Sequence, residues 1–161
     1  MSVLSVRTPS GATVERVVVE HPGAAAVVPL IDDDVLLVRQ YRAVADESML
    51  EIPAGKLDDP AENPRDAAHR ELEEETGWVA NDLMHLSTIW TAVGFSDEQI
   101  AIYLASHLTR GVKAPAGAEE EEAEIVRMPF LEAKRMVLDG EISDAKTVTG
   151  ILLADQLRGS D

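Results

Sequence analysis

The sequence predicts one α+β domain in which helices pack on a mixed β-sheet. Apolar segments of strand length fill the first part of the chain, a helix with clear capping residues follows them, and two further helices close the chain. A length of 161 residues and a hydrophobic content of 45% suit one compact domain over residues 1–161. The chain contains no internal repeat and no linker.

The first part of the chain is predicted to form strands. Residues 3–8 and 13–20 are valine-rich and are joined by a turn at Pro9-Ser10-Gly11. Residues 24–30 and 35–41 are continuous apolar runs on either side of an acidic turn, which is typical of buried strands in a central sheet. A short extended segment then ends at Gly55, and a loop leads to the first helix.

The clearest helix begins after Asn63. Asn63 is a suitable N-cap, Pro64 fits the first helical position, and Asp66 stands three residues after the cap. Gly77 then occupies a position where a left-handed residue ends a helix. These residues fix both ends of the predicted helix.

The remaining elements are strands followed by helices. A Gly/Ala/Pro-rich loop over residues 111–118 and the acidic run that follows it separate the last strand from the others. Strands are predicted over residues 83–91, 99–106 and 125–128, and helices over residues 131–138 and 144–157.

Composition narrows the class of protein. Thirty acidic against fourteen basic residues give a net charge of −16, which would repel nucleic acid and anionic membranes, so neither is an expected partner. The chain has no cysteine and no apolar run of the ~20 residues that span a bilayer. Residues 1–11 lack a basic segment followed by an apolar one, so a secretory signal is not expected. We therefore expect a soluble cytoplasmic protein.

The acidic residues gather in two clusters, at residues 71–75 and 119–124. On a helix, Glu71, Glu74 and Glu75 converge on one face, where like charges repel unless a cation lies between them. Carboxylate oxygens are the ligands that Mg²⁺ prefers. The simpler interpretation, a solvated acidic face balanced by Arg70, is the usual one for an isolated run of glutamates.

The residues around this run favour the metal site. The segment 70–78 reads Arg-Glu-Leu-Glu-Glu-Glu-Thr-Gly-Trp, with Glu62 eight residues before it and Gly55 further back. This arrangement resembles the Nudix box: a glycine, five residues, a glutamate, seven residues, then Arg-Glu, an apolar residue, any residue, Glu-Glu, any residue, Gly and an apolar residue. Here six residues separate Gly55 from Glu62. We expect the extra residue to change the loop without rotating the helix.

The resemblance implies a Nudix fold, an αβα sandwich with a mixed central sheet, and a metal-dependent enzyme. It assigns Glu71, Glu74, Glu75 and the backbone carbonyl of Ala54 to Mg²⁺, with Mn²⁺ as the alternative, and Arg70 to orienting the glutamates. The implied chemistry is attack of water on phosphorus, with metal ions offsetting the charge of the transition state.

The resemblance extends to the ADP-ribose pyrophosphatase branch through residues 18–24, 38–42, 50–56, 94–98 and 138–142. It implies hydrolysis of ADP-ribose to AMP and ribose 5-phosphate. It assigns Arg42, Glu51 and Glu98 to substrate binding, with Arg42 at the diphosphate and Glu98 at the ribose or the metal-bound water. The simpler interpretation of Arg42 is an exposed charge at the end of a strand. The branch usually has proline where this chain has Val93, so another nucleoside diphosphate sugar stays open as the substrate.

The same branch takes its general base from a late acidic loop. We expect Glu121 or Glu122 in this role and Glu120 next, while the other glutamates of the loop are solvated. The branch also uses its N-terminal strands to pair subunits, so residues 1–20 are expected to join a homodimer. A Nudix-type module that binds ADP-ribose without cleaving it is the alternative to an enzyme, although such modules typically lack glutamates of the box.

Overall fold

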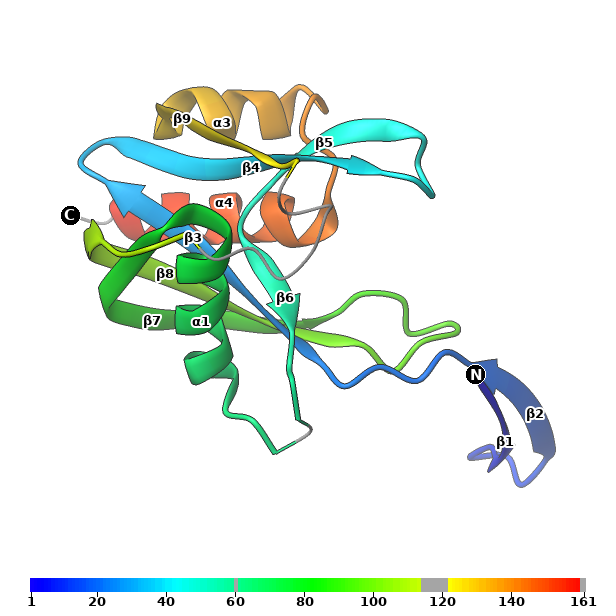
Figure 1. The fold of residues 1–161 in the computed structure, drawn as a ribbon. Helices are drawn as coiled ribbons and strands as arrows, with labels where there is room; N and C mark the ends of the chain where they lie inside the picture. Colours follow the sequence, from blue (N-terminus) through cyan, green and yellow to red (C-terminus); the bar gives the residue numbers. More distant parts are fainter. Residues whose placement is uncertain (60, 114–121, 160–161) are drawn as a thin grey trace.

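The computed structural model describes residues 1–59, 61–113 and 122–159 (Figure 1). The predicted strands and helices in these ranges are present, and the α+β class is confirmed. In chain order the elements are β1 (Ser2–Arg7), β2 (Thr13–Val18), β3 (Ala24–Ile31), β4 (Asp34–Arg42), β5 (Glu47–Glu51), β6 (Ala54–Lys56), α1 (Pro64–Thr76), β7 (Trp78–Trp90), β8 (Gln99–Arg110), β9 (Glu124–Pro129), α3 (Phe130–Leu138) and α4 (Ala145–Arg158).

A seven-stranded mixed sheet forms the centre of the fold. Its strands run in the order β5-β4-β3-β8-β7, with β6 paired to β3 and β9 paired to β4. The pair β3–β8 is parallel, whereas β3–β4, β4–β5 and β7–β8 are antiparallel. This confirms the predicted mixed sheet.

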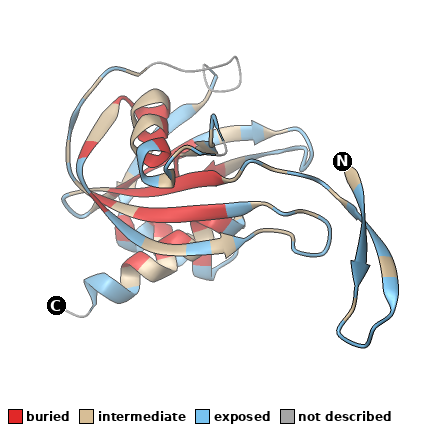
Figure 2. Ribbon diagram, turned by 90° about the horizontal axis from the view of Figure 1, so that it is seen from below, coloured by how far each residue is buried: buried red, intermediate tan, exposed pale blue. Residues whose placement is uncertain are grey.

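Strand β3 is covered on both faces, which explains its continuous apolar sequence (Figure 2). Ala25 and Val27 pack with Ala67 and Leu72 of α1 on one face. The alternate residues of β3 pack with α3 and α4 on the other face, around the buried Phe130. Side chains alternate between the two faces of a strand. A strand with helices on both faces therefore needs apolar residues at every position. The αβα sandwich is therefore confirmed.

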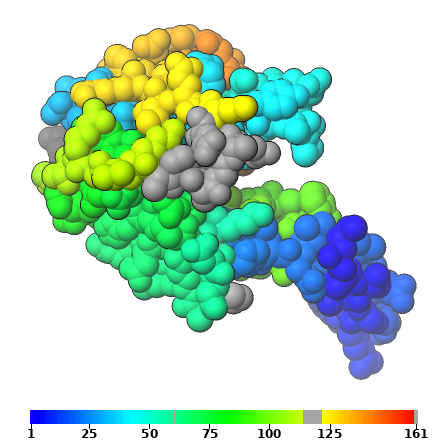
Figure 3. Space-filling view, in the orientation of Figure 1, coloured from blue at the N-terminus to red at the C-terminus, as the bar shows by residue number. Residues whose placement is uncertain are grey.

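The N-terminal hairpin β1–β2 forms a separate two-stranded sheet that projects from the body of the molecule (Figures 1 and 3). It joins the body at Val19, whose N–H donates to the Phe95 carbonyl at 2.7 Å and whose carbonyl accepts from Ser96 Oγ at 2.9 Å. Apolar side chains of this hairpin are exposed, among them Val3 and Val17.

Strands β7 and β8 are longer than predicted. Strand β7 begins directly after Gly77, and its first residues pair with the last residues of β8, from Trp78 with Arg110 onward. These end positions are partly polar and exposed, so they lack the apolar pattern of a strand, and pairing between the two strands extends them. Each described helix is too short or too polar to cross a bilayer.

Candidate active site

Helix α1 presents its glutamates to one side of the sheet because its ends and its buried face are fixed. The Asn63 side chain accepts a hydrogen bond from the Arg65 N–H, and Gly77 ends the helix with a positive φ of 70°. Ala67, Ala68 and Leu72 are fully buried against the sheet. The neighbouring helical face, which carries the glutamates, then lies beside β6.

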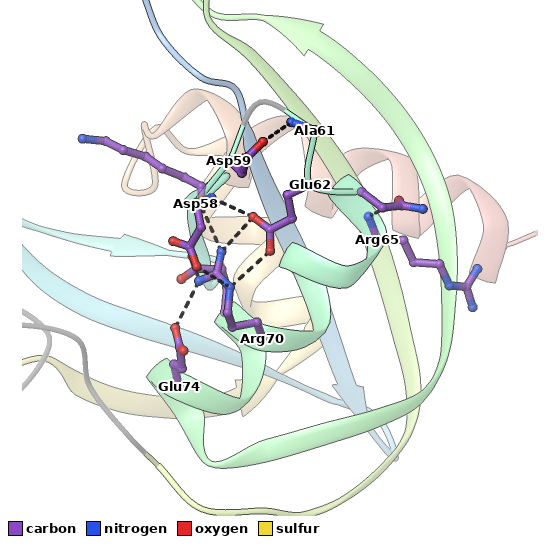
Figure 4. A network of polar contacts seen from close by, with 10 residues as sticks. Asp58, Asp59, Ala61, Glu62, Arg65, Arg70 and Glu74 are labelled. Carbon is purple, nitrogen blue, oxygen red and sulfur yellow. Dashed lines mark hydrogen bonds and ion pairs between the residues drawn. The ribbon is translucent and has the colours of Figure 1, made fainter.

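Arg70 lies at the centre of an acidic cluster (Figure 4). Its Nη1 donates to Glu71 Oε1 at 2.6 Å and to Glu74 Oε2 at 3.2 Å, and its Nε and Nη2 each lie 3.3 Å from the Glu62 carboxylate. Asp58 completes the cluster at 3.4 Å. Burial lowers the pKa of Arg70, but its hydrogen bonds to Glu62 and Glu71 outweigh burial and raise the pKa further above its ordinary value. Arg70 is therefore charged and binds Glu62, Glu71 and Glu74. Its role in orienting the glutamates for a metal stays a prediction.

The loop before α1 accommodates its additional residue locally (Figure 4). The Glu62 N–H donates to the Asp59 carbonyl at 2.8 Å, and Glu62 Oε2 accepts from the Asp58 N–H at 2.7 Å. The hydrogen bond from the Asp58 N–H, followed by that from Arg70, lowers the pKa of Glu62. Because Glu62 still reaches Arg70, the extra residue leaves the phase of the helix unchanged.

Gly55 and Ala54 bring β6 against the helix glutamates. A Cβ atom at Gly55 would lie 2.1 Å from the Glu71 carboxyl group, so only glycine permits this packing. The Ala54 N–H donates to Glu75 Oε2 at 3.1 Å. Glu71 and Glu75 are both buried, and buried carboxylates require compensation by donors or cations.

Two of the predicted metal ligands, Glu71 and Glu75, contact β6, and Glu74 shares Arg70 with Glu71. The carboxylates of Glu71, Glu74 and Glu75 and the backbone carbonyl of Ala54 are oxygen donors of the kind that Mg²⁺ and Mn²⁺ bind. Each of the three carboxylates accepts at least one hydrogen bond from Arg70 or Ala54. Within the described ranges, however, no three or more His, Cys, Asp or Glu side chains are placed so that together they could hold a metal ion. The assignment of these ligands stays a prediction.

A second group of predicted residues lines a hollow of about 320 Å³. Arg42, Glu51 and Glu98, the three predicted substrate contacts, all face it, together with residues of the α4 N-terminus. Arg42 Nε donates to Glu51 Oε1 and Arg42 Nη2 to Glu51 Oε2, each at 2.6 Å. Glu98 accepts from Thr91 Oγ1, and its other oxygen lies 3.3 Å from His21 Nε2. The fold thus brings together residues that lie far apart in the sequence.

Comparisons with known proteins identify the family to which this site belongs. Residues 20–149 match the family model described as the NUDIX domain. The chain belongs to the NUDIX family. The prediction of a Nudix enzyme is therefore confirmed, and enzymes of this family generally depend on divalent metal ions.

Individual relatives resemble the chain over most of its length. It is 41% identical to the ADP-ribose pyrophosphatase of Mycobacterium tuberculosis, over 91% of this chain and 72% of that protein. It is 38% identical to the methanol dehydrogenase activator of Bacillus methanolicus, over 94% of this chain and 82% of that protein. Among solved structures, an ADP compounds hydrolase matches with a TM-score of 0.81 and 27% identity, over 98% of this chain and 85% of that one.

The late acidic loop of this Nudix chain is described only in part. Glu120 and Glu121, two of the three candidate bases, lie outside the described residues. Glu122 is exposed and lines a separate hollow of about 250 Å³ with residues of β4 and β5. Next to it, Glu124 pairs with Arg39 at 3.2 Å. The role of this loop stays a prediction.

The start of α4 belongs to the site, although the sequence interpretation did not include it. Lys146 contacts Glu51, and Thr147 Oγ1 accepts from the Ile52 N–H at 2.9 Å. A signal was present, because a lysine in the first turn of a helix opposes the helix dipole and therefore needs a specific anionic partner. The sequence does not identify that partner.

Proposed function

We propose that the protein hydrolyses ADP-ribose to AMP and ribose 5-phosphate, using Mg²⁺ or Mn²⁺. The observation that carries this proposal is the hollow shared by Arg42, Glu51 and Glu98. Ala54 lies three residues after Glu51. The hydrogen bond to Glu51 raises the pKa of Arg42, and the charge of Glu75 adds a smaller contribution in the same direction. A diphosphate bound by Arg42 would therefore lie next to the metal ligands.

The residues of the chain have separate tasks in this reaction. Arg42 directs N–H donors toward the non-bridging oxygens of the diphosphate, and Glu98 accepts hydrogen bonds from ribose hydroxyls. A glutamate of the late loop takes a proton from the attacking water as its oxygen bonds to phosphorus and the bridging P–O bond breaks. The α1 glutamates and the Ala54 carbonyl would hold the divalent ions, which when bound would neutralise phosphate charge and lower the pKa of the attacking water.

A direct assay tests this proposal. ADP-ribose is incubated with the protein and Mg²⁺ or Mn²⁺, and AMP and ribose 5-phosphate are identified by mass spectrometry. The expected result is metal-dependent formation of both products. Binding of ADP-ribose without any cleavage would instead establish the non-catalytic module. No binding and no cleavage would reject both.

A different nucleoside diphosphate sugar is a second candidate substrate. Val93, which replaces the usual proline, is 74% exposed and lines an apolar hollow of about 540 Å³ with Trp90 and Phe95. We propose that this loop contacts the part of the substrate beyond the diphosphate, so that a residue change here alters substrate preference. Comparing kcat/KM for ADP-ribose and GDP-mannose decides between the substrates. Replacement of Val93 by proline should shift the ratio toward ADP-ribose if this loop sets the preference.

We also propose that the protein forms a homodimer through residues 1–20. The hairpin β1–β2 has exposed apolar residues, and a two-stranded hairpin is marginally stable by itself in water. Leu4 and Val6 of the hairpin contribute to the same apolar hollow as Trp90.

A nucleotide substrate and the absence of a disulfide framework support placing this dimer in the cytoplasm.

Light scattering tests the dimer. Deletion of residues 1–18 keeps Val19, which bonds to the loop near Glu98, and should give monomers. The single change Val17→Glu, at an exposed position, should weaken the dimer without removing the hairpin. A monomeric intact protein at micromolar concentration would reject the proposal.

A further inference from the structure

Lys146 is a buried cation that the proposed chemistry leaves without a role. It lies in the first turn of α4 with only 9% of its surface exposed. Burying an ammonium group costs several kcal/mol unless it is paired, and the helix dipole adds to this cost at an N-terminus. Its Nζ contacts Glu51 Oε2 and lies 3.0 Å from Asp144 Oδ1. The pairing with Glu51 is therefore a specific feature of the fold.

Glu51 connects Lys146 to Arg42. Both oxygens of Glu51 accept hydrogen bonds from Arg42, and Oε2 also accepts one from Lys146. Burial raises the pKa of Glu51, but the hydrogen bond from Arg42 and the charge of Lys146 outweigh burial, so its pKa lies below the ordinary value. An ionised carboxylate can accept both bonds of the Arg42 fork, whereas a protonated one has lost part of this capacity.

The backbone that carries Lys146 is fixed against the same strand end. Asp144 caps α4 by accepting from the Thr147 N–H at 3.0 Å. Thr147 Oγ1 donates to Asp144 Oδ2 at 2.6 Å and accepts from the Ile52 N–H, directly after Glu51. Lys146 is therefore held in place, unlike a flexible surface lysine that meets a carboxylate by chance.

Arg42 itself is available to a ligand. Its side chain is 40% exposed at the hollow, while the Glu51 side chain behind it is 4% exposed. The cluster is ordered from the buried α4 outward: Lys146 holds Glu51, and Glu51 holds Arg42. Lys146 thus restricts the conformation of Glu51, and Glu51 restricts the conformation of Arg42.

We propose that Lys146 is a positioning residue that, through Glu51, orients Arg42 for binding the diphosphate of the substrate. The inference rests on the proposed function, because it takes Arg42 as the diphosphate contact. It assigns to α4 a part in substrate affinity and adds no new contact with the substrate.

A double-mutant cycle tests this inference. The variants are Lys146→Met, Arg42→Ala and the two combined. The probe is the ADP-ribose analogue with a methylene group in place of the bridging oxygen, measured with Mg²⁺ by calorimetry. We expect Lys146→Met to weaken binding about tenfold in the parent protein, because misplaced donors lose affinity steeply. In the Arg42→Ala background it should change affinity by less than about twofold.

The control variant is Lys134→Met. Lys134 also pairs with a carboxylate of α4, Asp155 at 2.8 Å, but it does not line the hollow. This variant should lose an ion pair and keep its affinity for the analogue. Lys146→Arg, which retains the charge, should keep affinity nearer to that of the parent than Lys146→Met does. Thermal unfolding is recorded for every variant, and Lys146→Gln replaces Lys146→Met in the cycle if the latter does not fold.

Two results would overturn the inference. Equal losses of affinity in both backgrounds would mean that Lys146 contacts the ligand itself or acts only through stability, and unchanged affinity would mean that it has no part in binding. Failure of the proposed function is a separate observation. A parent protein that binds the analogue through Arg42 but cleaves no nucleoside diphosphate would reject the hydrolase and leave the inference in place.

Discussion

Two charge clusters on either side of the β5–β6 turn have opposite compositions. Around Arg70, one guanidinium meets four carboxylates, whereas Glu51 meets two cations, one of which, Lys146, also pairs with Asp144. The first cluster carries surplus negative charge and attracts divalent cations. In the second cluster, Glu51 holds the Arg42 side chain at the edge of the hollow. The guanidinium donors of Arg42 are suited to binding an anionic group there. A metal-bound diphosphate requires both kinds of site next to each other.

Removing a carboxylate from the first cluster should have the largest effect on turnover. Glu75→Gln replaces a predicted metal ligand, and loss of several kcal/mol of transition-state stabilisation lowers kcat by about a thousandfold at 1.36 kcal/mol per factor of ten. Glu73→Gln on the same helix is the matched control, because Glu73 is oriented toward the Val112 N–H instead. Steady-state kinetics at saturating Mg²⁺ measures both. More than half of the parent rate in Glu75→Gln would reject its role as a ligand.

Changes in the late acidic loop should have the next largest effect. Replacing the general base by glutamine typically lowers kcat by ~10²–10⁴ with little change in KM, because the base acts on water. We expect about a hundredfold for the responsible single variant, since neighbouring glutamates can substitute in part. Single and combined Gln variants of Glu120, Glu121, Glu122 and Glu124 separate these contributions. A combined variant with near-parent kcat would shift the role to Glu98.

A conservative change at Arg70 tests how far the orientation of the carboxylates in the first cluster affects metal binding. Arg70→Lys keeps the charge but loses the guanidinium fork that reaches several carboxylates at once. Replacing a residue that orients metal ligands typically costs roughly 10–100-fold in metal affinity, so we expect the Mg²⁺ concentration for half-maximal rate to rise by about that factor. The exposed Arg65→Lys on the same helix should leave it unchanged. An unaltered Mg²⁺ requirement in Arg70→Lys would show that charge alone is sufficient.

The smallest expected effect is a difference between the two clusters in how their contribution to stability depends on pH. Glu51 and Glu62 both have a lowered pKa, so the stability each contributes is complete above the unfolded pKa of about 4.3 and is lost as pH falls through the folded pKa. The difference in unfolding free energy between the parent and Glu51→Gln should therefore narrow below about pH 4. Glu62→Gln should show a smaller difference, because solvent screens a more exposed group. Urea unfolding from pH 3 to 7 measures the unfolding free energy of the parent and of both variants. Equal losses of stability in Glu51→Gln and Glu62→Gln would show that the two clusters do not differ in this respect.

The sequence alone determined the features that depend on local physics. The caps Asn63 and Gly77 define both ends of α1, and helical periodicity places Glu71, Glu74 and Glu75 on one side of it. Continuous apolar runs identified the buried strands β3 and β4, because a strand covered on both faces has no polar side. The order of motifs identified the family.

Only the tertiary structure decided which distant residues share a site. Lys146 and Glu51 are separated by 95 residues, and their contact depends on how α4 packs against the end of β5. The extents of β7 and β8 likewise depend on their mutual pairing. Helix caps and periodicity involve residues within one or two turns, so the sequence displays them directly. A buried ion pair is fixed by the packing of whole layers, and a charged residue carries no mark in the sequence of the partner that compensates its burial.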